Sequence, residues 1–126
     1  MPPLPIALAF LAGIGLVAVG IGALLRPAGL AHGYGLPVEE PNGLSFVRAT
    51  GTRDVVIGAI LIAVAYLRSL EVLIVVVAAG LVLSLADFMI AFVGNGGRIH
   101  RQHVTHVGGA IAFAVILVLL ITSIRP

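Results

Sequence analysis

The sequence contains no cysteine, no lysine and few charged residues of any kind. The absence of cysteine excludes disulfide bonds, thiol catalysis and thiolate metal sites. All seven basic residues are arginines, and they form no basic cluster interleaved with aromatic residues, so we expect no nucleic-acid partner. Only 10% of the 126 residues are charged, against about 25% in a typical soluble domain. Too few polar side chains remain to cover a surface in water, so most of the surface is expected to face lipid.

Long apolar runs take the place of the missing charge, and about 20 apolar residues suffice to cross a bilayer. The first run could instead be a cleaved signal peptide, but "MPPLP" carries no basic side chain and the run is long. We therefore predict an all-α, polytopic integral membrane protein with a single domain over residues 1–126. The four transmembrane helices should pack as a left-handed bundle in the cell (inner) membrane. Their approximate bounds are 4–25, 45–67, 70–93 and 103–124, with a long loop at 26–44.

The second apolar run begins directly after two adjacent charges, Arg53 and Asp54. The uncharged part, residues 55–67, covers about 20 Å as a helix, which is less than the roughly 30 Å of the hydrocarbon core. The helix must therefore begin earlier, near residues 45–48, and the two charges are expected about 10 Å inside the membrane.

The third apolar run is interrupted by Asp87, about 9 Å from its end by the same count. With four spans, this end lies on the same side of the membrane as the start of the fourth helix, where His103 and His106 stand. The sequence thus predicts a polar pocket among the second, third and fourth helices, closed by the loop. Tyr34 in that loop is expected at the pocket mouth or, more simply, as an interfacial anchor.

Adjacent helical residues point about 100° apart, so Arg53 and Asp54 are expected to find partners on other helices rather than each other. Arg53 with Asp87 and Asp54 with His106 are the natural pairs. One interpretation is a structural ion-pair network; the other is a ligand or proton site, which is the default for unexplained charge inside a membrane. Arg48 lies nearer the surface, where its side chain can extend toward headgroups.

The stretch "HRQHVTH" places His100, His103 and His106 at three-residue steps. Neutral imidazoles at this spacing can bind zinc or iron, and Asp87 would be a possible fourth ligand. However, the preceding "GNGG" is a poor helix start, and histidines facing headgroups are an ordinary alternative. We predict no bound metal and no cofactor.

Three stretches resemble the DoxX-like domain-of-unknown-function families of small four-helix membrane proteins: "ATGTRDVVIGAI", "ADFMIAF" and "HVTHVGGAIAF". The resemblance covers nearly the whole chain. Its most specific part is a Gly-x-Arg-Asp-x-x-x-Gly pattern, formed by Gly51, Arg53, Asp54 and Gly58. By this resemblance Asp87 and His106 complete the constellation. Most of the group has no assigned activity, so the resemblance implies a fold more than a function.

Three functions remain open. In the first, the pocket binds a small hydrophobic or lipid-like ligand with Arg53 as its anion contact, and the ligand-binding residues are Arg48, Arg53, Asp54, Asp87, His103 and His106. In the second, the protein is an acid–base isomerase or cyclase acting on a lipophilic substrate, with Asp54, Asp87 and His106 as catalytic residues. The third, a proton-coupled transporter, is least favoured because the far halves of the helices are almost free of polar residues.

The expected partners are membrane lipids and the hydrophobic ligand. A second copy of the chain is a further possible partner through small residues of the first helix that form two pairs, each with a four-residue step. These residues are Ala9, Gly13, Ala18 and Gly22.

Overall fold

The computed structural model describes residues 3–35, 38, 40–99 and 103–125. These residues form five α-helices and no strand. Four of the helices are long and apolar enough to cross a membrane, which confirms the predicted all-α fold with four transmembrane helices. The helices are α1 (Pro3–Leu25), α2 (Pro27–Gly33), α3 (Pro41–Leu67), α4 (Leu70–Gly94) and α5 (Val104–Thr122).

The segment expected as a long loop contains a short helix and the start of the next long one. α2 and α3 each begin at a proline, which is well tolerated in the first helical turn because its missing N–H has no helical partner there. α3 therefore begins at Pro41, earlier than the residues 45–48 expected from the sequence. Its 27 residues span about 40 Å, which exceeds the hydrocarbon thickness of about 30 Å, so its ends reach the headgroup region.

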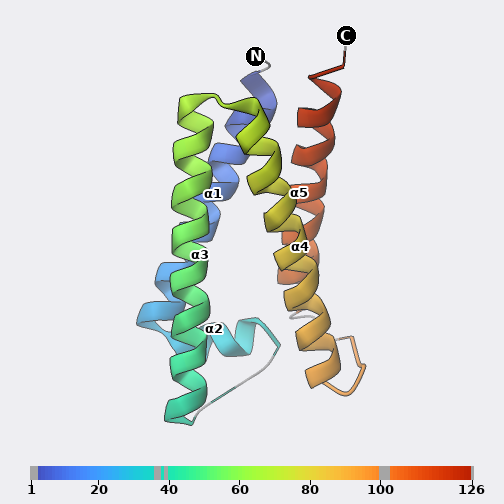
Figure 1. Cartoon of the computed structure of the whole chain (residues 1–126). Coiled ribbons are helices and arrows are strands. Elements are labelled where there is room, and N and C mark those ends of the chain that lie inside the picture. Colours follow the sequence, from blue (N-terminus) through green and yellow to red (C-terminus); the bar gives the residue numbers. More distant parts are fainter. Residues whose placement is uncertain (1–2, 36–37, 39, 100–102, 126) are drawn as a thin grey trace.

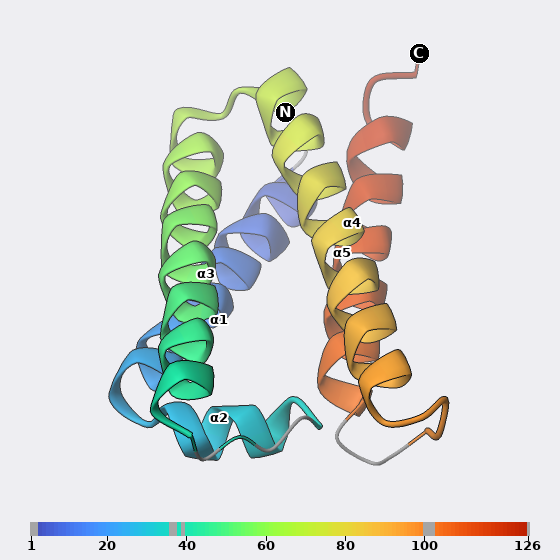
Figure 2. The same cartoon turned by 60° about the horizontal axis from the view of Figure 1, so that its bottom comes forward.

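The helices form two close pairs, α1 with α3 and α4 with α5 (Figure 1). The tight turn between α3 and α4 joins the pairs at one end, where Arg68 adopts a left-handed conformation (φ 56°) that ends α3. From this turn the pairs diverge, and α2 crosses the wide end between them (Figure 2). The hydrophobic core lies toward the narrow end and includes Leu61, Ala65, Leu73, Val77 and Leu120.

Two reciprocal glycine contacts bring α1 against α3. A Cβ atom on Gly58 would lie 2.6 Å from the carbonyl oxygen of Gly13, and one on Gly20 would lie 2.5 Å from the carbonyl oxygen of Gly51. The glycines are seven residues, or two helical turns, apart on both helices, so both contacts fall on one antiparallel seam. Such close backbone approach is a common way to pack helices in lipid, where apolar burial gives no driving force.

The small residues at four-residue steps on α1 only partly belong to this seam. Ala9 and Gly13 are buried, but Ala18 is exposed and Gly22 faces Leu30 of α2. Gly20, which makes the second close contact, lies outside the predicted set. The seam joins two helices of the same chain, so these buried residues are not free to contact a second copy.

We predict that Gly58→Ala destabilises the protein by about 1–3 kcal/mol, the usual range for overpacking, because the new methyl group meets the backbone of α1. Gly108→Ala is the matched control, since a Cβ there meets nothing within 4 Å. Thermal unfolding in lipid nanodiscs measures both. Equal stability of the two variants would contradict a close contact between the backbones of α1 and α3.

Candidate functional site

The glycine seam determines which way the charged residues of α3 point. Asp54 follows Gly51 by three residues, so it shares the buried side of α3 and is only 8% exposed. Arg53 lies about 100° further around the helix. Its side chain reaches across to α4.

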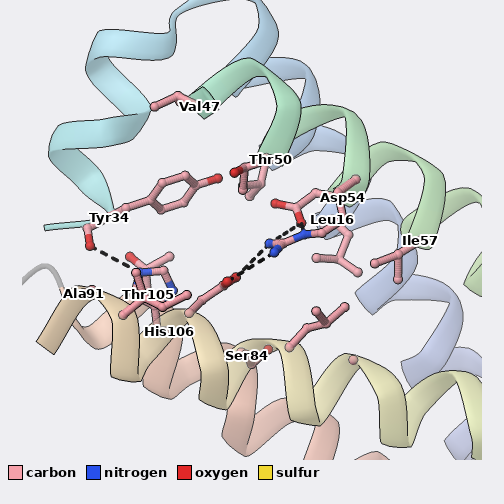
Figure 3. Close-up of a pocket in the computed structure, with 18 of the residues that line it drawn as sticks. Leu16, Tyr34, Val47, Thr50, Asp54, Ile57, Ser84, Ala91, Thr105 and His106 are labelled. Atoms are coloured by element: carbon pink, nitrogen blue, oxygen red, sulfur yellow. Dashed lines mark hydrogen bonds and ion pairs between the residues drawn. The ribbon is translucent and has the colours of Figure 1, made fainter. Parts of the chain in front are cut away.

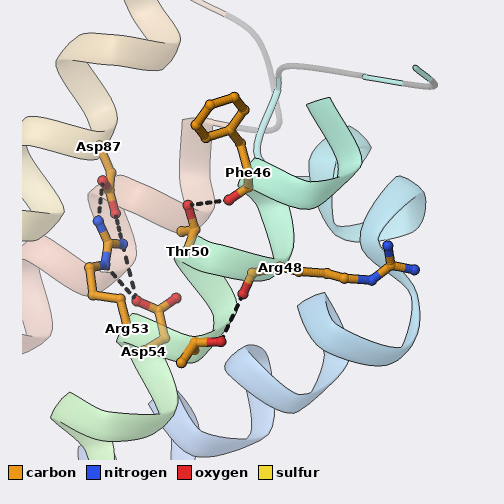
Figure 4. Close-up of polar contacts among 7 residues, drawn as sticks. Phe46, Arg48, Thr50, Arg53, Asp54 and Asp87 are labelled. Atoms are coloured by element: carbon orange, nitrogen blue, oxygen red, sulfur yellow. Dashed lines mark hydrogen bonds and ion pairs between the residues drawn. The ribbon is translucent and has the colours of Figure 1, made fainter. Parts of the chain in front are cut away.

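The guanidinium of Arg53 bridges two carboxylates (Figure 4). On one edge, Nη1 and Nη2 donate to Oδ1 and Oδ2 of Asp87 at 3.2 and 2.8 Å. On the other edge, Nε and Nη2 donate to Oδ1 of Asp54 at 3.2 and 3.0 Å. The predicted pairing of Arg53 with Asp87 is confirmed, and its fork-like geometry is the favourable one for a guanidinium and a carboxylate.

The expectation that Arg53 and Asp54 do not pair is wrong. It considered only the direction in which the Cα–Cβ bond of each residue leaves the helix. The arginine side chain is long enough to turn back along its own helix, and its planar group offers two separate hydrogen-bonding edges. One arginine therefore serves both its neighbour and a residue on another helix.

The predicted contact between Asp54 and His106 is also wrong. His106 Nε2 instead lies 3.2 Å from the backbone oxygen of Tyr34, and the two rings are 5.5 Å apart between centroids (Figure 3). The carboxylate of Asp54 turns to Arg53, which provides charge-assisted hydrogen bonds. His106 thus contacts the C-terminal end of α2 and not an acidic side chain.

The charged triad of Asp54, Arg53 and Asp87 lines a cavity of about 580 Å³. Most of the lining is apolar, and α1 contributes to it through residues such as Gly15 and Leu16, although the pocket was expected among the other three long helices only. Beyond the triad, the polar lining residues are Tyr34, Thr50, Ser84, Thr105 and His106. Thr50, Ser84 and Thr105 were not foreseen, because single hydroxyl side chains in apolar helices carry no distinctive signal.

Two of the predicted ligand-binding residues do not line this cavity. Arg48 points away from it, with Nε 3.4 Å from the carbonyl oxygen of Leu24 (Figure 4). It precedes Arg53 by five residues, which rotates it about 140° around α3. His103 is 1% exposed and sets its ring edge-on against Phe88 of α4, with 5.7 Å between centroids.

The predicted histidine series is only partly described, because His100 lies outside the described residues. In the part of the chain that the structure describes, no three His, Asp or Glu side chains group closely enough to hold a metal ion. His103 and His106, although three residues apart, contact different elements.

The segment at the C-terminal end of α2 forms hydrogen bonds with α4 and α5 at the wide end between the helix pairs. Besides the contact of Tyr34 with His106, Asn95 Nδ2 donates to the carbonyl oxygen of Gly35 at 2.5 Å and to that of Ala91 at 3.0 Å. Asn95 caps the end of α4, so α2 connects to both members of the α4–α5 pair. The sequence pattern does not reveal Asn95, since its role depends on a distant backbone carbonyl.

The hydroxyl of Tyr34 is buried, and within the described residues it has no hydrogen-bond partner. Its ring extends toward Thr50 and Asp54 (Figure 3). Burial raises the pKa of Tyr34 to about 12, with the carboxylates of Asp54 and Asp87 acting in the same direction and Arg53 opposing them. Tyr34 therefore remains a neutral hydrogen-bond donor at any physiological pH.

The chain has only two tyrosines, so Tyr66→Phe leaves Tyr34 as the only one. We predict that its ultraviolet tyrosinate absorbance then titrates near pH 12 in the folded protein and near pH 10 after unfolding. Because the unfolded state loses this proton first, the free energy of unfolding should fall as the pH rises from about 10 to about 12. A folded-state midpoint near pH 10 would contradict the buried position of this hydroxyl.

The triad also predicts an order of stabilities. Arg53→Gln leaves two neighbouring carboxylates without their cation and should cost about 3 kcal/mol, the lower end of the range for buried pairs because Arg53 is 32% exposed. Asp87→Asn should cost less, since Arg53 keeps Asp54. The double variant Arg53→Gln/Asp87→Asn should be more stable than Arg53→Gln alone. Purely additive losses in thermal unfolding would exclude the Arg53–Asp87 contact.

The fold and the site define a multi-pass membrane protein of four transmembrane helices with a charged triad beside a cavity. Residues 13–120 match the family model described as Domain of unknown function (DUF4267), which covers most of the chain, and the protein belongs to this family. Neither the curated proteins nor the solved structures contain a match to the chain.

Proposed function

We propose that the protein binds a small, largely hydrophobic molecule from the membrane in its cavity. The observation that carries this proposal is the triad of Asp54, Arg53 and Asp87 facing an apolar cavity of about 580 Å³. Small-molecule sites usually measure about 300–1,000 Å³ and combine apolar walls with a few convergent polar groups. Membrane lipids supply the surroundings from which such a ligand enters.

A purely structural triad fits these observations less well. Burying an ion pair is a weak source of stability, and charge within a membrane span usually marks a functional site. The side chains of Arg53 and Asp87 lie on neighbouring spans and line the cavity. They keep 32% and 26% of their surface exposed. A pair that served packing alone would be better enclosed.

An acid–base enzyme is the second candidate, favoured by the Tyr34 hydroxyl, which has no hydrogen-bond partner among the described residues and lies in the same cavity as two carboxylates. In this case Asp54 or Asp87 is the base and Tyr34 the neutral acid. His106 is less suited to the role expected from the sequence, because Tyr34 engages its Nε2 atom. Transport is least favoured, since among the described residues it is the hydrophobic core that lies toward the narrow end.

The Gly51–Arg53–Asp54–Gly58 pattern supports the further inference that this family is close to the DoxX-like proteins. The residues of this pattern have two roles in the structure. The glycines belong to the contact with α1, and the charged pair belongs to the cavity. We also infer that the membrane in which the protein lies is the cell (inner) membrane.

Filling the cavity tests the proposal. Gly15 lines the cavity and a Cβ there meets nothing within 4 Å, so Gly15→Trp introduces a large side chain with an unobstructed first carbon. Gly108→Trp is the matched control, because Gly108 is equally unobstructed but does not line the cavity. The probe is pyrenebutanol, a neutral lipophile, and its binding to protein in phosphatidylcholine nanodiscs is followed by pyrene fluorescence against empty nanodiscs.

We predict that the wild type and Gly108→Trp bind pyrenebutanol and that Gly15→Trp binds it at least about tenfold more weakly, a loss of about 1.4 kcal/mol. Unaltered binding in Gly15→Trp, with its fold confirmed by circular dichroism, would refute the cavity as the binding site.

A further inference from the structure

The hydrogen-bonding capacity of Arg53 is almost exhausted within the triad. A guanidinium has five N–H donors, and four hydrogen bonds already run from Arg53 to Asp54 and Asp87. A carboxylate or phosphate on a bound molecule would find at most one donor on this side chain. It would also bring a third negative group beside the two aspartates.

The two carboxylates, in contrast, have acceptor capacity to spare. Each ionised carboxylate offers about four lone-pair sites, and Oδ2 of Asp54 takes no part in the hydrogen bonds of the triad. With one cation and two anions, the triad carries a net charge of −1 when all three groups are ionised. Arg48, the other arginine near the start of α3, points away and does not compensate this charge (Figure 4).

The other polar lining residues do not restore the balance. His106 directs its Nε2 atom to the backbone oxygen of Tyr34 rather than to either carboxylate of the triad. Thr50, Ser84 and Thr105 contribute only hydroxyl groups. The cavity is thus electronegative at its polar end, in surroundings where charge is weakly screened.

We propose that the polar end of the ligand is a protonated amine, which donates hydrogen bonds to the carboxylates of Asp54 and Asp87 while its apolar body fills the cavity. The inference rests on the proposed function and names the ligand class for that site, a lipophilic amine. It replaces the expectation that Arg53 is an anion contact. One ammonium group brings the net charge of the occupied site to zero and uses the free acceptor positions.

Three probes of the same shape test the preference for charge: pyrenebutylamine, pyrenebutanol and pyrenebutyric acid. Binding is measured to the whole protein in phosphatidylcholine nanodiscs. For each probe the signal from Gly15→Trp nanodiscs is subtracted, which removes the different partitioning of the three probes into lipid. The wild type should bind the amine at least about tenfold more tightly than the acid or the alcohol, the scale expected for a hydrogen bond to a charged group.

Two variants separate charge from shape. Asp87→Asn brings the triad to zero net charge and should reduce the preference for the amine at least about tenfold. The double variant Arg53→Gln/Asp87→Asn returns the net charge to −1 through Asp54 alone, so the preference should reappear. If Asp87→Asn folds poorly, the double variant still decides, because loss of the preference in a folded protein with the net charge of the wild-type triad would overturn the amine proposal.

The outcomes distinguish this inference from the proposed function. If the alcohol or the acid binds as tightly as the amine, or if the preference survives in Asp87→Asn, the amine proposal is overturned while binding in the cavity stands. If none of the three probes loses affinity in Gly15→Trp, binding in the cavity is itself refuted.

Discussion

The ion pair between Arg53 and Asp87 joins the two halves of this protein. α1 and α3 pack tightly through their glycines, and α4 packs along α5, but the two pairs diverge from the turn at residues 68–69. On the wide-end side of the hydrophobic core, a bidentate salt bridge spans the gap between α3 and α4. Separating these charges in lipid would expose both to a medium that solvates them poorly, so the bridge limits how far the halves can open.

The cavity follows from this arrangement of helices. The glycine seam uses one side of α3 for contact with α1, which leaves Arg53 on the side that faces α4. Because the salt bridge holds α3 and α4 at the reach of an arginine side chain, the helices cannot close on each other at this level. α2 then covers the wide end and is held by His106 and Asn95. The charge and the space thus depend on the side chain of Arg53, whereas the cover depends on His106 and Asn95.

Much of the fold could be predicted from the sequence, because hydrophobic length and helix geometry are local properties. Counting the rise per residue from helix ends was enough to bring Arg53 and Asp87 to one level. Sequence reasoning failed where the length of a side chain mattered, because a helical wheel does not show that the side chain of Arg53 can turn back to Asp54. It also failed where a partner was needed. Gly20 can be recognised as a helix-contact residue only when Gly51 is known to lie opposite it. The four-residue spacing of Ala18 and Gly22 does not reveal which residues face a partner helix.

The most direct measurement is isotope-edited solid-state NMR of the protein in lipid bilayers, which recouples the guanidinium nitrogens of arginine with the carboxyl carbons of aspartate. A direct contact, with Nη2 and Oδ2 2.8 Å apart, predicts a strong dipolar coupling between Arg53 and Asp87, identified by its disappearance in Asp87→Asn. A spectrum in which no arginine–aspartate coupling depends on Asp87 would contradict the salt bridge and, with it, the claim that this bridge keeps the cavity open.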